Sequence, residues 1–520
     1  MVAAIAATVE EDLLQKMKSS PFLTILADES TDVTVTKKLV ICVRLLDDNF
    51  FPSTHFVADI NVTDGKGATV AVAIKDYLKS KEIPLSKIYG FGSDGAASMT
   101  SMGNGVAGRL LAENPAMVHI HCIAHRLALC TSQAANAIDY MKDYQSTITS
   151  IFYYFKASSV RVNRITAIQE LLDEPILKCN EVHEVRWLPY YKAIETIYRT
   201  YGSLVSYMSE MGASDAKAKG FAKKLSQFSF VFVTHMLLSI LSIVTELCLL
   251  FQKKDLDPAL VDVNVKHALR ELQKHRDHDT SSEGLTGKPG SYIEEFLLKV
   301  GTGQRKFFRD HLLTCCANYE KQCKAIQCQF IDNLINNINA RFPQDHLDMV
   351  TAFGYLSIRP LSFLSESERE NWGEVPIQKL ASHYGNIVEH HGSKSVPIII
   401  EKQGMSEWSK LKELVFRMGY ARDATYNLWS IIKTHHSEDF PNLLKLAAIS
   451  LILPIHTSDC ERTFSSQYYI KNHRRNRLSE TRLQQCLLIM IEGKAIGDFD
   501  FKSALDILKK EKKRRIYNKQ

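Results

Sequence analysis

Hydrophobic and polar positions follow two different periods within the first part of the chain. Residues 1–20 place apolar side chains at a helical spacing, which predicts an amphipathic N-terminal helix. Three short apolar runs that end in acidic residues then follow at 21–32, 37–48 and 54–64. Runs of this length, rich in Val, Ile and Leu and separated by polar turns, predict an antiparallel meander of three strands.

Helices and strands alternate after the meander. A helical period over 65–83 precedes a strand at 86–99 that runs into a glycine-rich turn. A short helix follows at 103–115, and residues 117–144 read as a strand that leads into a long helix. The order βββαβαβα is typical of a mixed sheet covered by helices. It matches the ribonuclease-H arrangement, so we predict an α/β core of this class.

Residues from about 150 to 440 have an almost wholly helical pattern, which predicts a large all-α insertion that interrupts the core. The longest apolar run, at 228–244, is nearly long enough to cross a bilayer. It contains His235 and runs into Glu246, so we predict a buried helix and no membrane partner. The predicted parts are an N-terminal helix at 1–20, the first part of the core at 21–150, the insertion at 151–440, a C-terminal region completing the core at 441–495, and a basic tail at 496–520.

The formal net charge of +6 is concentrated at the C-terminus. The last twelve residues hold seven Lys/Arg and one Glu, so the other 508 residues carry 57 basic and 57 acidic side chains. A nucleic-acid surface on the body must therefore be a local patch, while the tail is a solvated basic arm. Such an arm suits a nuclear import signal, a phosphate-binding tail or a solubilising terminus. Eleven cysteines without a regular spacing indicate a reducing compartment.

Two carboxylates follow strands that a ribonuclease-H topology makes neighbours. Asp28 ends the first predicted strand and Asp94 ends the fourth, so the two carboxylates are expected to lie close together. Close carboxylates repel one another unless a cation lies between them, and Mg²⁺ or Mn²⁺ takes such oxygen ligands. Glu461 is the candidate third ligand of a two-metal site. The alternative is that Asp28 caps a turn and that Asp94 with Gly95 forms a plain turn.

A second cluster has metal-ligand residue types at a helical spacing. Cys122 and His125 lie one turn apart, with His121 nearby, which makes a zinc site conceivable. A partner pair at a familiar spacing is missing from the sequence. The alternative is buried packing with a hydrogen-bonded histidine.

These residues together resemble the hAT transposases, which are cut-and-paste DNA transposases with a ribonuclease-H-like core. The matching segments are "ILADESTD" with Asp28, "GFGSDGAASM" with Asp94, "HCIAHRLAL" with Cys122 and His125, "VRWLPYYKAI" with Trp187, and "SDCERTFSSQYYIKNHRRNRLSETRLQQCLLI" with Glu461 and Arg462. The last segment is similar to the family's C-terminal dimerisation signature. The helical part resembles a vertebrate subgroup of zinc-finger-fused, transposase-derived proteins.

The resemblance implies a catalytic, metal-binding triad of Asp28, Asp94 and Glu461, with Mg²⁺ or Mn²⁺ as cofactor if the chain is catalytically competent. It also implies two partners, DNA and a second copy of the chain, and a nuclear location; no small-molecule substrate is expected. Basic side chains close to Glu461 would bind phosphates without reading sequence. Trp187 would stack on a base turned out of the duplex, or serve as a core aromatic. The residues expected to contact DNA are Trp187, His125, Arg462, Lys471, Arg474, Arg475 and Arg477.

Two functions remain open on the sequence. A working member of the family carries an N-terminal zinc finger, and no Cys/His finger spacing occurs in this sequence. The chain is therefore expected to be a fragment, a decayed copy or a domesticated descendant. We favour a transposase-derived protein that dimerises and binds DNA. The alternative is an active metal-dependent DNA transposase.

Overall fold

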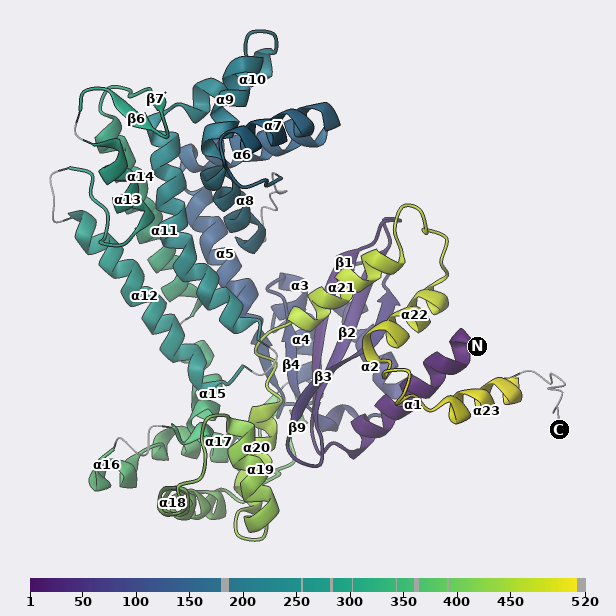
Figure 1. Cartoon of the computed structure of the whole chain (residues 1–520). Helices are drawn as coiled ribbons and strands as arrows, with labels where there is room; N and C mark the ends of the chain where they lie inside the picture. The colour runs from purple at the N-terminus through teal and green to yellow at the C-terminus, as the bar shows by residue number, and fades with distance from the viewer. Residues whose placement is uncertain are drawn as a thin grey trace. The chain divides into compact units, whose positions relative to one another are not determined.

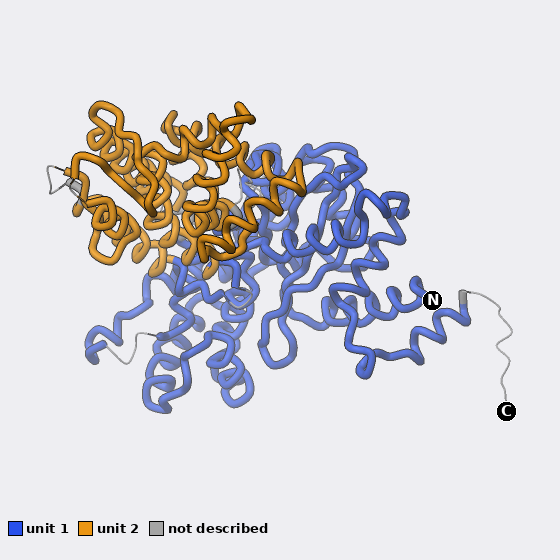
Figure 2. The backbone as a smooth tube through the Cα atoms, turned by 45° about the horizontal axis from the view of Figure 1, so that its top comes forward, with its two compact units in different colours: residues 1–125, 251–261, 344–520 blue, residues 126–250, 262–343 orange. Residues whose placement is uncertain are grey.

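The computed structural model describes residues 1–178, 187–253, 256–280, 284–301, 303–342, 344–359, 364–390 and 392–511. The chain forms two compact units, which are coloured separately in Figure 2. Unit 1 comprises residues 1–125, 251–261 and 344–520, and unit 2 comprises residues 126–250 and 262–343.

Unit 1 contains a five-stranded mixed sheet with the strand order β3-β2-β1-β4-β5. The strands are β1 (Leu23–Thr31), β2 (Lys37–Leu46), β3 (Pro52–Asn61), β4 (Ile88–Ser93) and β5 (Val118–His121). The first three are antiparallel, while β4 and β5 run parallel to β1. Helix α1 (Val2–Ser19) precedes the strands and α5 (Ile123–Asn136) follows them, and the helices between them are α2 (Gly67–Ser80), η1 (Leu85–Lys87), α3 (Ala97–Thr100) and α4 (Val106–Leu111). The predicted order of strands and helices along the chain is observed (Figure 1).

Alternate residues of β1 supply two separate apolar cores, as the pleat of a strand requires. Ile25 and Ala27 belong to the core that is formed with α1, α2 and α4. Leu26 belongs to the opposite core, together with Cys460 of α21 (Ser458–Ile470) and Leu487 of α22 (Glu480–Glu492). The C-terminal helices α21 and α22 therefore cover one face of a sheet whose strands come from the N-terminal quarter of the chain (Figure 1).

Side chains of α22 also satisfy the outer edge of β3, the strand at one end of the sheet. The bonds run from Asn61 N–H to Glu480 (2.8 Å), from Asp59 N–H to Gln484 (2.8 Å), from Gln484 to the Val57 carbonyl (3.0 Å) and from Phe56 N–H to Glu492 (2.7 Å). An edge strand otherwise presents a row of unpaired backbone groups. This helix therefore takes the place of a neighbouring strand along β3.

Helices from residue 344 to 451 belong to unit 1, so the segment predicted as one insertion is divided between the two units. They are α15 (Gln344–Gly354), η2 (Tyr355–Ser357), α16 (Glu366–Asn371), α17 (Glu374–Gly385), α18 (Glu401–Met418), α19 (Thr425–His436) and α20 (Pro441–Leu451). A short hairpin of β8 (Glu389–His390) and β9 (Ser393–Lys394) lies among them. The ring of Tyr384 in α17 lies 6.0 Å from that of Tyr89 in β4. Aromatic packing of this kind joins these helices to the sheet.

Unit 2 is built mainly from helices. They are the remainder of α5, then α6 (Asp139–Lys156), α7 (Ser159–Leu171), α8 (Trp187–Arg199), α9 (Tyr201–Met211), α10 (Ala216–Leu225), α11 (Phe228–Phe251), α12 (Ala259–Thr280), α13 (Tyr292–Val300) and α14 (Tyr319–Arg341). One hairpin joins β6 (Lys306–Phe308) to β7 (His311–Leu313). Among the described residues, α11 is the one helix long and apolar enough to cross a membrane, and 78% of its most apolar stretch is buried within the structure. That burial is typical of a core helix.

The predicted basic tail at 496–520 begins with a helix, α23 (Phe501–Glu511). Ala504 of this helix is buried, and α23 packs against α1. The first part of the predicted tail is therefore folded, whereas the prediction of a solvated arm for residues 512–520 lies outside the described residues.

Candidate functional site

Strands β1 and β4 bring Asp28 and Asp94 to the same end of the sheet, although β1 continues to Thr31 and Asp28 therefore lies within the strand and not at its predicted end. The parallel register pairs Leu26 with Gly92, and each aspartate follows its member of that pair by two residues. Both side chains are half-buried. Each also makes a local bond, because Asp28 accepts from Glu29 N–H at 2.9 Å and Asp94 accepts from Ala96 N–H at 3.2 Å. The bond to Asp94 is the one expected of a turn-capping residue, whereas Asp28 lies within β1 and is paired with Val40 of β2.

The segment before α21 crosses the face of β4 where that strand has no side chains. A Cβ on Gly92 would lie 2.6 Å from Cβ of Pro454, and one on Gly90 would lie 3.0 Å from its Cδ. The carbonyl of Ile455 accepts a hydrogen bond from Ile123 N–H at 3.0 Å. Two glycines in β4 therefore allow the chain to pass close to the strand and to begin α21 beside the sheet.

Cys122 links two of the segments that carry the predicted triad, those of Asp94 and Glu461. Its N–H donates to the Ser93 carbonyl at 2.9 Å, next to Asp94, and its sulfur accepts from Thr457 N–H at 3.4 Å, just before α21. Burial raises the pKa of this thiol, and the Glu461 carboxylate raises it further. The cysteine therefore holds α21 against the sheet, which is the packing role left open by the sequence.

The first turn of α21 lies near both β1 and Cys122. A hydrogen bond with Cys42 and burial raise the pKa of the Cys460 thiol, and the Asp28 carboxylate contributes to the same shift. Glu461 is half-buried. Among the residues that the structure describes, however, no group of three or more His, Cys, Asp or Glu side chains is arranged to hold a metal ion. The segments that carry the three carboxylates adjoin one another, and metal binding by Asp28, Asp94 and Glu461 stays a prediction.

Glu29 is an acidic neighbour that the sequence reasoning did not assign to the site. Burial raises the pKa of this carboxyl, Lys37 opposes the shift, and Asp94 and Asp64 add to it. Glu29 therefore lies within electrostatic reach of Asp94. Its position directly after Asp28 was the one sign in the sequence that Glu29 could belong to the site. Successive side chains of a strand point to opposite faces, however, so Glu29 lies on the face opposite Asp28.

Histidines flank the turn that carries Asp94. A Cβ on Gly95 would lie 2.3 Å from the ring of His121, and the rings of His121 and His125 are 5.7 Å apart. The described residues provide no zinc cluster around Cys122 and His125. His125 is half-buried in the first turn of α5, and its contact with DNA stays a prediction.

The basic stretch after α21 divides into one internal cation and three exposed ones. Lys471 donates to Asp32 at 2.6 Å and to Thr34 at 3.1 Å, and both charged side chains of this ion pair are largely buried. Burial alone would raise the pKa of Asp32, but the hydrogen bond from Lys471 helps to hold it well below its ordinary value. The ammonium group of Lys471 is therefore engaged within the protein. Arg474, Arg475 and Arg477 are exposed.

Two further residues expected to contact DNA lie elsewhere. Arg462 is exposed on α21 and forms an ion pair with Asp459. Trp187 begins α8 in unit 2, and its side chain lies outside the described residues. Base stacking by Trp187 therefore stays a prediction.

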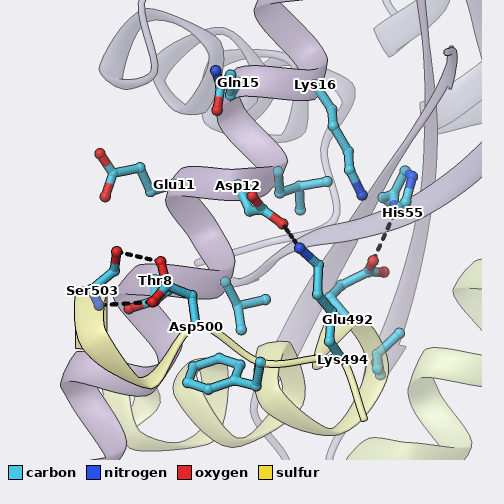
Figure 3. Close-up of a pocket in the computed structure, with 14 residues that line it drawn as sticks. Thr8, Glu11, Asp12, Gln15, Lys16, His55, Glu492, Lys494, Asp500 and Ser503 are labelled. Atoms are coloured by element: carbon cyan, nitrogen blue, oxygen red, sulfur yellow. Dashed lines mark hydrogen bonds and ion pairs between the residues drawn. The ribbon is translucent and has the colours of Figure 1, made fainter. Parts of the chain in front are cut away.

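A polar groove of about 390 Å³ lies in unit 1 among α1, β3, α22 and α23 (Figure 3). Lys494 bridges to Asp12 at 2.6 Å across it, and His55 bonds Glu492 at 2.7 Å. None of the predicted site residues lines this groove.

Comparison with protein families identifies two regions of the chain. Residues 1–105, which include Asp28 and Asp94, match the ZMYM1/FAM200 RNase-like domain. Residues 411–495 match the hAT family C-terminal dimerisation region, which here extends from within α18 to just beyond α22. The chain therefore joins an RNase-like domain to a hAT dimerisation region, and the resemblance to the hAT family is confirmed for these parts.

Two curated relatives match part of the chain. The chain is 22% identical over 218 residues to General transcription factor II-I repeat domain-containing protein 2 of Bos taurus. It is 29% identical over 136 residues to the protein of the same name from Mus musculus. These matches cover 41% and 25% of this chain, but only 22% and 14% of the relatives. The chain thus matches less than a quarter of the length of either relative.

Proposed function

We propose that this chain is a domesticated or decayed transposase derivative that self-associates and binds DNA in the nucleus. The observation that carries the proposal is the hAT dimerisation region at 411–495, whose α21–α22 loop exposes three arginines. A sheet in the order β3-β2-β1-β4-β5, whose strands β1 to β4 lie within the RNase-like match, supports a ribonuclease-H-like class for the core. The basic C-terminus supports nuclear import.

Arg474, Arg475 and Arg477 are suited to phosphate contacts because they lie in one short exposed loop. Guanidinium groups bind phosphates strongly, and such contacts do not depend on base sequence. Residues 1–508 as a whole carry equal numbers of basic and acidic side chains. A local patch is therefore the feature that would draw this body to a polyanion.

Replacing Arg474, Arg475 and Arg477 together with alanine is expected to weaken binding to a short DNA duplex by about 10- to 100-fold at about 0.1 M salt. The slope of log Kd against log salt should fall by about three, since up to three phosphate contacts are lost. Fluorescence anisotropy at several salt concentrations measures both quantities. The matched control replaces Lys402, Lys410 and Arg417, three exposed cations of α18.

The proposed DNA binding would be contradicted if the control variant lost as much duplex affinity as the arginine variant, or if the parent chain did not bind the duplex. Sedimentation velocity tests the other part independently, because a chain that stays monomeric at micromolar concentration would not self-associate as proposed. A fluorescent fusion that stays outside the nucleus would contradict the proposed location.

A metal-dependent DNA strand transferase is the second candidate, and it is favoured by the convergence of the segments that carry Asp28, Asp94 and Glu461. In this case purified chain with Mn²⁺ should nick a supercoiled plasmid, and Asp94→Asn should reduce nicking by about 100-fold or more. Asp12→Asn, outside the triad, should leave nicking unchanged. Nicking that persists in Asp94→Asn would assign the cleavage to a contaminant and reject this candidate.

A further inference from the structure

Two adjacent tyrosines in the last turn of α21 are exposed to an unusual degree. Tyr468 is 60% exposed and Tyr469 is 76% exposed. Aromatic side chains of this size are ordinarily buried over most of their surface, since each removes a large apolar area from water. Their neighbours Gln467 and Ile470 are buried against the sheet. The tyrosines therefore do not contribute to the core and point away from it.

The tyrosines share one exposed face of α21 with Arg462. Arg462, Ser465 and Tyr469 are spaced by three and four residues, which places them on the same side of a helix. All three are exposed, and Tyr468 lies next to them. This face leads directly into the loop of residues 472–477, which carries the exposed arginines and is bonded to the Tyr469 carbonyl through Asn472.

The loop has a defined shape. Asn472 accepts hydrogen bonds from the N–H groups of Arg474 at 3.0 Å and Arg475 at 3.2 Å, and its amide donates to the Tyr469 carbonyl at 3.2 Å. Just before it, the buried ion pair of Lys471 with Asp32 fastens the chain to the end of β1. A surface held in this way loses less conformational entropy on binding than a disordered arm.

The charge of this surface selects the kind of partner. From Arg462 to Ser479 the sequence contains five Lys or Arg residues and no acidic residue. Lys471 is neutralised by Asp32 and Arg462 pairs with Asp459, which leaves Arg474, Arg475 and Arg477. Two copies of the chain that met symmetrically through this surface would bring like charges together, which is unfavourable. A polyanion is complementary to it.

Aromatic rings beside the arginines distinguish one form of polyanion from another. A tyrosine ring stacks on the flat face of a base, and this contact is available for any base. In a duplex those faces are covered by neighbouring base pairs, whereas an unpaired strand exposes them. Exposed tyrosines together with phosphate-binding arginines are thus the combination that suits a single strand.

We propose that Tyr468, Tyr469 and the exposed arginines of the α21–α22 loop form a binding surface for unpaired DNA, with bases stacked on the tyrosines and phosphates on Arg474, Arg475 and Arg477. The inference rests on the proposed DNA binding and specifies the form of DNA that is bound. The tyrosines supply the preference for an unpaired strand, and the arginines supply the affinity that single strands and duplexes share.

The test compares labelled oligo(dT) of about 20 nucleotides with a duplex of about the same length, by fluorescence anisotropy on the whole chain. Tyr468→Ala/Tyr469→Ala is expected to weaken oligo(dT) binding by about tenfold or more and duplex binding by less than about twofold. Tyr468→Phe/Tyr469→Phe should restore oligo(dT) binding, because phenylalanine retains the ring. Tyr153→Ala removes an exposed tyrosine of α6 in unit 2 and serves as the matched control.

The outcomes separate the two proposals. If neither DNA binds, the proposed DNA-binding function fails. If both forms bind but the double alanine variant weakens them equally or not at all, that function stands and the unpaired-strand inference is overturned. A double alanine variant with an altered sedimentation coefficient would also overturn the inference, because the tyrosines would then belong to a self-association surface.

Discussion

Replacing Lys38 with methionine is expected to lower the free energy of unfolding by about 3–5 kcal/mol at neutral pH. Lys38 of β2 lies 3.2 Å from Asp59 of β3, and their side chains are 2% and 0% exposed. The pair lies on the face covered by α21 and α22, where Gln467 also donates to Asp59 at 3.4 Å. Without the ammonium group, the variant would retain a buried carboxylate that lacks its counter-charge.

The pH dependence of this effect follows from Asp59. Burial raises the pKa of this carboxyl above its ordinary value of 3.8, and Lys38 opposes that shift. A carboxyl whose pKa is higher in the folded state favours folding while it is protonated, and this contribution is lost as pH rises through the folded-state pKa. Loss of Lys38 raises the folded-state pKa further. The stability difference between the two proteins should therefore be largest near neutral pH and shrink as pH falls.

Urea unfolding of the parent chain and the variant at several pH values measures this difference. Lys75→Met is the matched control, because Lys75 pairs with Glu113 at the surface and such pairs contribute less than about 1 kcal/mol. Lys38→Met with Asp59→Leu should recover most of the loss, since an apolar pair carries no unpaired charge. A Lys38→Met variant as stable as the control would contradict the expected effect.

Replacing Gly92 with valine is expected to lower the free energy of unfolding by about 3 kcal/mol. Even the Cβ would lie 2.6 Å from Cβ of Pro454 and 2.8 Å from Cδ2 of Leu26. Valine would therefore push the segment before α21 away from β4. That segment leads into α21, the helix that carries Glu461. DNA binding with self-association, or metal-dependent DNA cleavage, should therefore weaken along with the stability.

Thermal unfolding followed by circular dichroism measures the loss, and sedimentation velocity reports whether self-association is lost with it. Gly220→Ala is the matched control, because a Cβ at this position of α10 would meet nothing within 4 Å. Alanine in place of glycine within a helix should even add up to about 1 kcal/mol. A Gly92→Val variant as stable as the parent chain would show that the approach of Pro454 to β4 is not needed for packing.

Local features of the fold were predictable because each leaves a mark on the sequence nearby. The three apolar runs became β1, β2 and β3, and the strand with its glycine-rich turn became β4 followed by Asp94. Ser479 is a favoured N-cap residue type directly before α22, and its hydroxyl accepts from Arg482 N–H at 3.3 Å. Periodicity and capping depend on neighbouring residues, so one chain contains enough information for them.

Features that depend on distant partners were not predictable in this way. Lys471 reads as one of four cations in a basic stretch, and only its pairing with Asp32, 439 residues earlier, separates it from Arg474 and its neighbours. The helices after residue 344 join the sheet through contacts such as Tyr384 with Tyr89. The positions of Tyr384 and Tyr89 in the sequence do not indicate that these two rings meet. The approach of Asp28, Asp94 and Glu461 was partly predictable, because strand ends in a parallel pair share an edge, whereas the exact placement of their carboxylates was not.

The bonds from Glu480, Gln484 and Glu492 to β3 have a consequence for assembly. A second copy cannot extend the sheet at this side while α22 remains docked. Truncation before α22 would instead expose the unpaired backbone groups of the β3 edge and favour amyloid-like stacking. The C-terminal region thus protects the edge of the N-terminal sheet, in addition to its proposed role in self-association. Shortened forms of the chain that lack α22 should precipitate.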